Sequence, residues 1–95
     1  MLTGKQKRYL RSQAHHLPAF FQIGKEGVQQ PQIESMKNAL HVHELLKVKI
    51  LRSCPLSKEE VATMLQLGTG GQIVQTMGHT IVLFAPSKKR IYQLP

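Results

Sequence analysis

Residues 45–52 read LLKVKILR, and this stretch decides how the rest of the chain can be arranged. Apolar side chains alternate here with lysines: Leu46, Val48 and Ile50 point to one face of the stretch, and Lys47 and Lys49 point to the other. A period of two is typical of a strand that buries one face. The stretch therefore predicts a strand with an apolar inner face and a basic outer face.

Before this strand, the pattern predicts a helix, a short strand and a second helix. Residues 3–16 form the first helix, in which Thr3 and Gln6 have the spacing of a capping box. Its apolar residues are Leu10, Ala14 and Leu17. Residues 19–23 are expected to form a strand. The second helix covers 31–43, with a proline at a tolerated first-turn position, and its apolar face consists of Ile33, Met36, Leu40 and Val42.

After the central strand, a third helix and a hairpin are predicted. Ser57 and Glu60 again have capping-box spacing, and the apolar face that follows consists of Val61, Met64, Leu65 and Leu67. Gly68 is expected to end this helix. Residues 72–77 and 79–85 then read as two strands joined by a tight turn.

The element order is therefore αβαβαββ, within one domain that covers residues 1–95. A helix joins strands 19–23 and 45–52, so these two should be parallel and related by a right-handed crossover. The hairpin adds an antiparallel partner. The expected fold is a two-layer α/β sandwich with a mixed four-stranded sheet, to which the tail 86–95 can add a short edge strand.

The charge of the chain points to polyanionic partners. Thirteen Lys and Arg residues stand against five acids, all of them Glu, for a net charge of +8. Such an excess favours phosphate-rich partners through long-range attraction and counterion release. The acid-free basic blocks contain Lys5, Lys7, Arg8, Arg11 and Lys25, then Lys47, Lys49, Arg52 and Lys58. Along the first helix, a phosphate-binding strip and an ordinary solvated face are both open interpretations.

Patterns of catalytic and metal-binding residues do not stand out. Glu59 and Glu60 fall in the first turn of a helix, where acids stabilise the helix dipole, and no nucleophile motif surrounds a serine. Adjacent or alternate histidines, as at 15–16 and at 41 and 43, diverge on a helix. Cys54 reads as a packing residue at the end of a strand. We therefore expect no enzymatic activity, no cofactor, no metal and no small-molecule substrate.

Features of membrane and secreted proteins are also missing from the pattern. The longest apolar run near the end of the chain, 81–85, is far too short to cross a bilayer. The basic N-terminus has no apolar segment behind it of the kind found in signal peptides. A single cysteine suits a reducing compartment. The expectation is a cytoplasmic monomer that does not bind membranes.

Residues 24–27, GKEG, form the most specific candidate for a binding site. They lie between a predicted strand and a predicted helix, where the first N–H groups of the helix are unpaired and the dipole is positive. Gly24 and Gly27 lack the Cβ atoms that hold a phosphate backbone away, and Lys25 adds a positive charge. Glu26 does not suit an anion site, and it is expected to point away or to limit promiscuous binding. A tight turn without a ligand remains the alternative.

Taken in order, several segments resemble one family, the CRM domain (chloroplast RNA splicing and ribosome maturation) in its single-domain bacterial, YhbY-type form. These segments are LTGKQKRYLRSQAHHL, FQIGKEGV, HELLKVKI and LGTGGQIVQTMGHTIVLF, followed by the basic tail. The resemblance implies a fold similar to that of the C-terminal domain of bacterial translation initiation factor three. It also implies that GKEG is a GxxG loop like that of KH domains, which clamp a nucleic-acid backbone.

The function implied by the resemblance is non-catalytic binding of ribosomal RNA, or its precursor, during assembly of the large ribosomal subunit. The RNA-binding residues would be Gly24, Lys25, Glu26 and Gly27, extended by Lys5, Lys7, Arg8, Arg11, Lys47 and Lys49. Two alternatives stay open. One is a protein-interaction module that docks onto a ribosomal protein, and the other is an RNA-binding accessory factor in splicing or translation.

Overall fold

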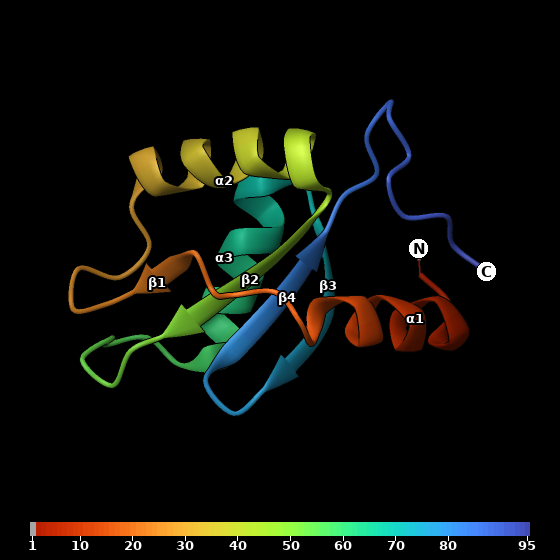
Figure 1. The fold of residues 1–95 in the computed structure, drawn as a ribbon. Coiled ribbons are helices and arrows are strands. Elements are labelled where there is room, and N and C mark those ends of the chain that lie inside the picture. The colour runs from red at the N-terminus through yellow and green to blue at the C-terminus, as the bar shows by residue number, and fades with distance from the viewer. Residues whose placement is uncertain (1) are drawn as a thin grey trace.

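A computed structural model describes residues 2–95, and its elements follow the predicted αβαβαββ order (Figure 1). They are α1 (Gly4–Ala14), β1 (Phe21–Ile23), α2 (Gln30–His43), β2 (Leu45–Ile50), α3 (Lys58–Thr69), β3 (Gln72–Met77) and β4 (Thr80–Phe84). The predicted strands 19–23 and 45–52 are both shorter in the structure. The predicted first helix, 3–16, ends two residues earlier, at Ala14.

The mixed four-stranded sheet is confirmed, with strand order β1-β2-β4-β3. Strands β1 and β2 are parallel, whereas β4 runs antiparallel to both β2 and β3. Gly78 has φ +56°, as the tight turn between β3 and β4 requires. Because β4 lies between β2 and β3, it is shielded on both of its edges.

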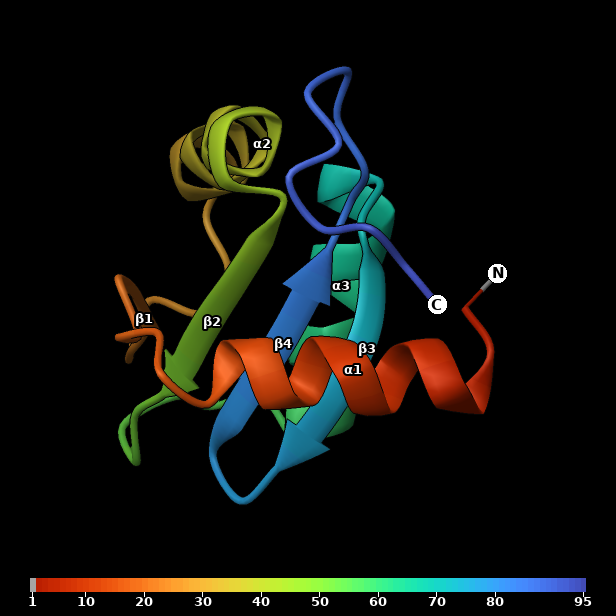
Figure 2. The ribbon, with the colours of Figure 1, turned by 45° about the vertical axis from the view of Figure 1, so that its right-hand side comes forward.

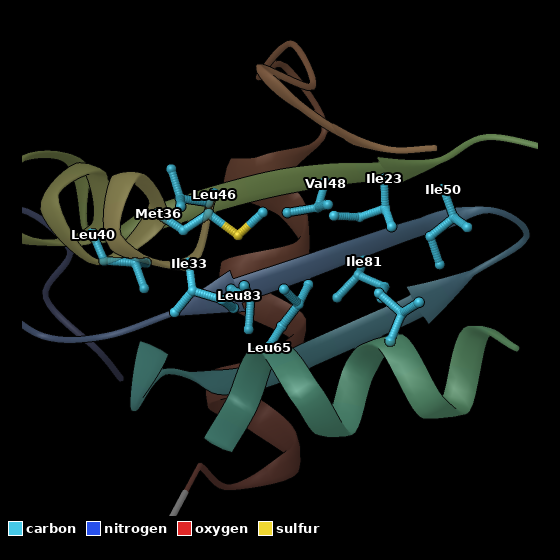
Figure 3. Close-up of a cluster of buried hydrophobic side chains, with 11 residues drawn as sticks. Ile23, Ile33, Met36, Leu40, Leu46, Val48, Ile50, Leu65, Ile81 and Leu83 are labelled. Carbon is cyan, nitrogen blue, oxygen red and sulfur yellow. The ribbon is translucent and has the colours of Figure 1, made fainter. Parts of the chain in front are cut away.

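The main core fills the face of the sheet that α2 and α3 cover (Figure 3). Its buried members are Ile23, Ile33, Met36, Leu40, Leu46, Val48, Ile50, Val61, Leu65, Ile81 and Leu83. Burial of one such side chain contributes about 1.5–3 kcal/mol relative to exposure. The predicted inward face of β2 and the apolar faces of both helices are therefore confirmed in their central residues.

Helix α1 lies on the opposite face of the sheet, so a third layer is added to the two that were predicted (Figure 2). A second, smaller cluster forms there, and it contains Leu2, Leu10, Ala14, Leu45, Val74, Val82 and Phe84. All four residues of 81–84 are buried. A strand that is covered on both faces reads as a continuous apolar run instead of an alternating one, as 81–84 does.

The ends of the helices show which glycines the fold requires. Both predicted capping boxes are present, at Thr3 on α1 and at Ser57 on α3. The prediction that Gly68 ends α3 is wrong, since the helix continues to Thr69 and is capped by Gly70 at φ +76°. A Cβ atom at Gly68 would lie 2.9 Å from Cδ1 of Ile33, so this glycine lets α3 pack closely on α2.

Several predicted surface and core assignments also change. Leu67 is 80% exposed and not part of the core, and Val42 and Met64 are exposed as well. Among the aromatic residues, Phe84 is buried but Phe20 is 73% exposed. Leu67 does not lie under the sheet, because the buried stripe of α3 runs through Val61 and Leu65.

The tail forms no strand over residues 85–95, and it is held instead by the buried carboxylate of Glu44. Glu44 caps α2 with φ +65°, a left-handed conformation that costs about 1 kcal/mol for a residue other than glycine. Its Oε2 accepts hydrogen bonds from the N–H (2.7 Å) and the hydroxyl of Ser87, and its Oε1 accepts one from the N–H of Tyr92 (3.0 Å). Burial raises the pKa of this carboxyl, but these hydrogen bonds outweigh it and hold the pKa below the ordinary 4.5.

We expect the Glu44 anchor to weaken in acid. Because its folded pKa is lowered, its contribution to stability is fully present above the ordinary pKa and is lost as pH falls through the folded pKa. Glu44→Gln should cost about 1 kcal/mol at neutral pH, the net value of a hydrogen bond at one site. Thermal unfolding between about pH 7 and pH 3 should show a steeper acid loss for the wild type than for the variant. Parallel pH profiles for the two proteins would contradict a charged anchor.

Candidate nucleic-acid interface

The loop 24–27 is a hydrogen-bonded turn at one end of the sheet. The N–H of Gly27 donates to the carbonyl of Gly24 at 3.0 Å, and Gly27 has φ +68°. A residue with a side chain is strained in that conformation, so the turn accounts for this glycine. The side chains of Lys25 and Glu26 are both exposed at the tip.

Gly24 differs from Gly27, because the fold does not require a glycine there. Its φ is not positive. A Cβ atom would meet Cδ1 of Leu51 at 3.5 Å and Oγ of Ser53 at 3.7 Å, which are ordinary van der Waals distances. The fold therefore provides no structural reason for a glycine at position 24.

The start of α2, next to this loop, is open. Its N-cap residue Gln29 makes no side-chain capping hydrogen bond, and its first turn holds no acid. Two glutamine side chains hold the loop instead: Nε2 of Gln29 donates to the carbonyl of Glu26 at 2.5 Å, and Nε2 of Gln32 donates to the carbonyl of Gln22 at 2.7 Å. The N-terminal end of a helix carries a partial positive charge, and beside a loop that is already held in place it favours the binding of an anion.

Five of the predicted basic residues fall into two groups along the α1 face of the molecule. Lys5 and Arg8 are exposed and Lys7 is half-buried, towards the N-terminal end of α1, which Figure 1 shows on the side of the molecule away from β1. Arg11 and Lys47 lie together, since both line a groove of about 230 Å³ between α1 and the sheet.

The two lysines of β2 do not have equal freedom, although both were predicted on an open outer face. Lys47 is half-buried under the end of α1, and its Nζ donates to the carbonyl of Leu17 at 3.1 Å. Lys49 is exposed, two residues nearer the GKEG end of the sheet. The difference arises because α1 covers only part of this face.

Acidic residues are separated from this face. Glu34 lies on α2, Glu59 and Glu60 lie at the start of α3, and Glu44 is buried. Only Glu26, at the tip of the loop, is close to the candidate interface. Within residues 2–95, the α1 face therefore carries basic side chains and no acid on α1, β2, β3 or β4.

Sequence reasoning missed His15 and Gln75, which line the same groove as Arg11 and Lys47. The only signal was that His15 follows Arg11 by four residues, which places both on the same side of α1. Cys54 is half-buried against the main core, as predicted. No group of three His, Cys, Asp or Glu side chains suited to a metal was found among residues 2–95. In the same range, no helix is long and apolar enough to cross a membrane.

An α/β module with one basic, acid-free face is the class of protein that this fold and site define. The family description that matches residues 2–84 is the CRS1 / YhbY (CRM) domain. The chain belongs to this family, as the sequence resemblance predicted.

Individual relatives agree with this assignment. The chain is 52% identical over 89 residues to "Probable RNA-binding protein YqeI" of Bacillus subtilis, covering 94% of this chain and 93% of that protein. It is 36% identical to an "RNA-binding protein" of Haemophilus influenzae, covering 99% and 95% of the two chains. A solution structure from Staphylococcus aureus, of a "putative RNA binding protein", shares 43% identity and superposes with a TM-score of 0.83 over 100% of both chains.

Proposed function

We propose that this chain is a non-catalytic RNA-binding protein that binds ribosomal RNA, or its precursor, and assists assembly of the large ribosomal subunit. The observation that carries the proposal is Gly24, a bare backbone position that the fold does not require. It lies beside the uncapped start of α2. The names of the relatives support RNA as the partner, and the resemblance to bacterial members of the family supports the ribosomal role.

In this proposal, the loop holds a phosphate of the RNA backbone. Backbone N–H groups at the loop and the start of α2 donate to phosphate oxygens, and the Lys25 ammonium adds a charge-assisted hydrogen bond. Glu26 repels anions that approach from its own side of the tip, which limits promiscuous binding. The basic side chains on the α1 face extend the contact, and the protein acts in the cytoplasm as a monomer without a cofactor.

A second candidate function, docking onto a ribosomal protein, is favoured by one feature of α3. Leu67 and Met64 are exposed on its outer surface, 80% and 41% respectively. Isolated apolar residues on a surface are normal, so this feature is weaker than the loop. The two functions predict different partners in cells, RNA for the first and a ribosomal protein for the second.

Crosslinking in cells, followed by sequencing of the bound RNA, tests the proposed function. The reads should concentrate on a few sites in large-subunit ribosomal RNA or its precursor. Crosslinks spread over messenger RNA would contradict the ribosomal role and support the accessory-factor alternative. Recovery of ribosomal protein without RNA crosslinks would support docking. The protein is recovered from the cells through an affinity tag, and cells that lack the tagged protein serve as the control.

A further inference from the structure

One row of side chains crosses the whole sheet on the part of its α1 face that α1 leaves uncovered. Register partners lie on the same face of a sheet. Gln22 pairs with Lys49, Lys49 pairs with Thr80, and Thr80 pairs with Met77. Gln22, Lys49 and Met77 are exposed, Met77 by 66%, and Thr80 is partly exposed. The row therefore runs from β1 to β3 without a buried member.

The row begins at the GKEG loop. Gln22 precedes Gly24 by two residues, so a side chain at position 24 would point to the same face. The atoms that such a side chain would meet belong to Leu51 and Ser53, just beyond the end of β2. Because position 24 is glycine, this residue adds no side chain to the surface between the loop and Lys49.

The other end of the row opens into the groove beside α1. Thr80 and Met77 line this groove of about 230 Å³ together with Arg11, His15 and Lys47. A strand spacing of about 4.8 Å places the two ends of the row roughly 14 Å apart. A basic site thus lies at each end of the row. The side chains of the row itself are either uncharged or cationic, and none is acidic.

We propose that a single-stranded segment of RNA lies along this row, with one phosphate at the GKEG loop and others in the groove of Arg11 and Lys47. This inference rests on the proposed function and names the form of RNA that is bound. Helix α1 borders the row as a ridge about 10 Å across, which holds a rigid duplex away from Lys49 but leaves room for one strand. The exposed thioether of Met77 offers a soft, polarisable surface to a base.

The test compares two double variants that each remove two positive charges. Arg11→Gln with Lys49→Gln alters the proposed path, whereas Lys37→Gln with Lys58→Gln alters α2 and α3 on the opposite face. All four side chains lie at the surface or are partly exposed, so both proteins should fold, and thermal unfolding checks this. The probes are single-stranded RNA of about 12 nucleotides, within the usual range of single-strand sites, and a duplex of the same length.

The wild type should bind the single strand at least about tenfold more tightly than the duplex, and the Arg11/Lys49 variant should lose about tenfold on the single strand. The Lys37/Lys58 variant should lose less than about threefold. Equal affinity for the two probes, or equal losses in the two variants, would overturn the path while leaving RNA binding at the loop intact. If the wild type bound neither probe, the proposed function would fail together with the path.

Discussion

Affinity for RNA is expected to fall by about two decades when monovalent salt is raised from about 50 to about 200 mM. Each phosphate that the protein neutralises lowers log K by about 0.7 per decade of salt for a single strand and about 0.9 for a duplex. The exposed Lys25, Arg11 and Lys49, with Lys47 and Arg8, supply roughly five such contacts. Filter binding to a ribosomal RNA fragment across a salt series measures the slope.

The same two double variants trace the salt dependence to particular residues. Arg11→Gln with Lys49→Gln should reduce the slope by about 1.4, because two phosphate contacts are lost. Lys37→Gln with Lys58→Gln should leave the slope nearly unchanged, although it removes the same charge. A flat salt response of the wild type would reject the electrostatic account, and it would favour docking of a protein partner on the surface of Leu67 and Met64.

The order of elements could be predicted because its signals are local. Alternation over 45–52 marks β2 with its inner face, and Thr3 and Ser57 begin their helices with complete capping boxes. The GKEG loop was placed correctly for the same reason, since it needs only the end of one element and the start of the next. None of these signals depends on residues far away in the sequence.

What could not be predicted depends on long-range contacts. Helical periodicity shows that α1 buries Leu10 and Ala14 but not which face of the sheet receives them, so the third layer and the partial burial of Lys47 were missed. The uninterrupted apolar run 81–84 was the available signal that both faces are covered. The tail was assigned a possible strand because its actual partner, Glu44, lies more than 40 residues earlier.

The candidate path also arises from long-range pairing. Gln22, Lys49, Thr80 and Met77 belong to four different strands, and only the register brings them into one row. In the sequence, Lys49 was one of many lysines, and neither Gln22 nor Met77 carries a motif. Local patterns are thus enough to locate the loop. The surface that continues from the loop can be recognised only once the pairing of the strands is known.

Replacing Lys25 and Glu26 together by aspartate is expected to weaken RNA binding by about 1–3 kcal/mol, the range of one or two charge-assisted hydrogen bonds. The double change, Lys25→Asp with Glu26→Asp, keeps both glycines and places two acids at the tip where a phosphate must lie. The melting temperature should move little, because surface substitutions usually stay within about 0.5 kcal/mol and aspartate is common in turns. RNA affinity is measured beside thermal unfolding for the variant and the wild type.

Two glycine variants separate the turn from the binding site. Gly27→Ala should lower stability, by about 1 kcal/mol, because φ is +68° there. Gly24→Ala should leave stability unchanged or raise it by about 0.4–1 kcal/mol, since its Cβ atom fits and the unfolded chain loses freedom. If Gly24 is bare so that RNA can approach, Gly24→Ala should nevertheless weaken binding. Should this variant and the double aspartate variant both bind as tightly as the wild type, GKEG is a turn only. The RNA surface would then lie on α1 and β2, where Arg11 and Lys49 would carry the contact without the loop.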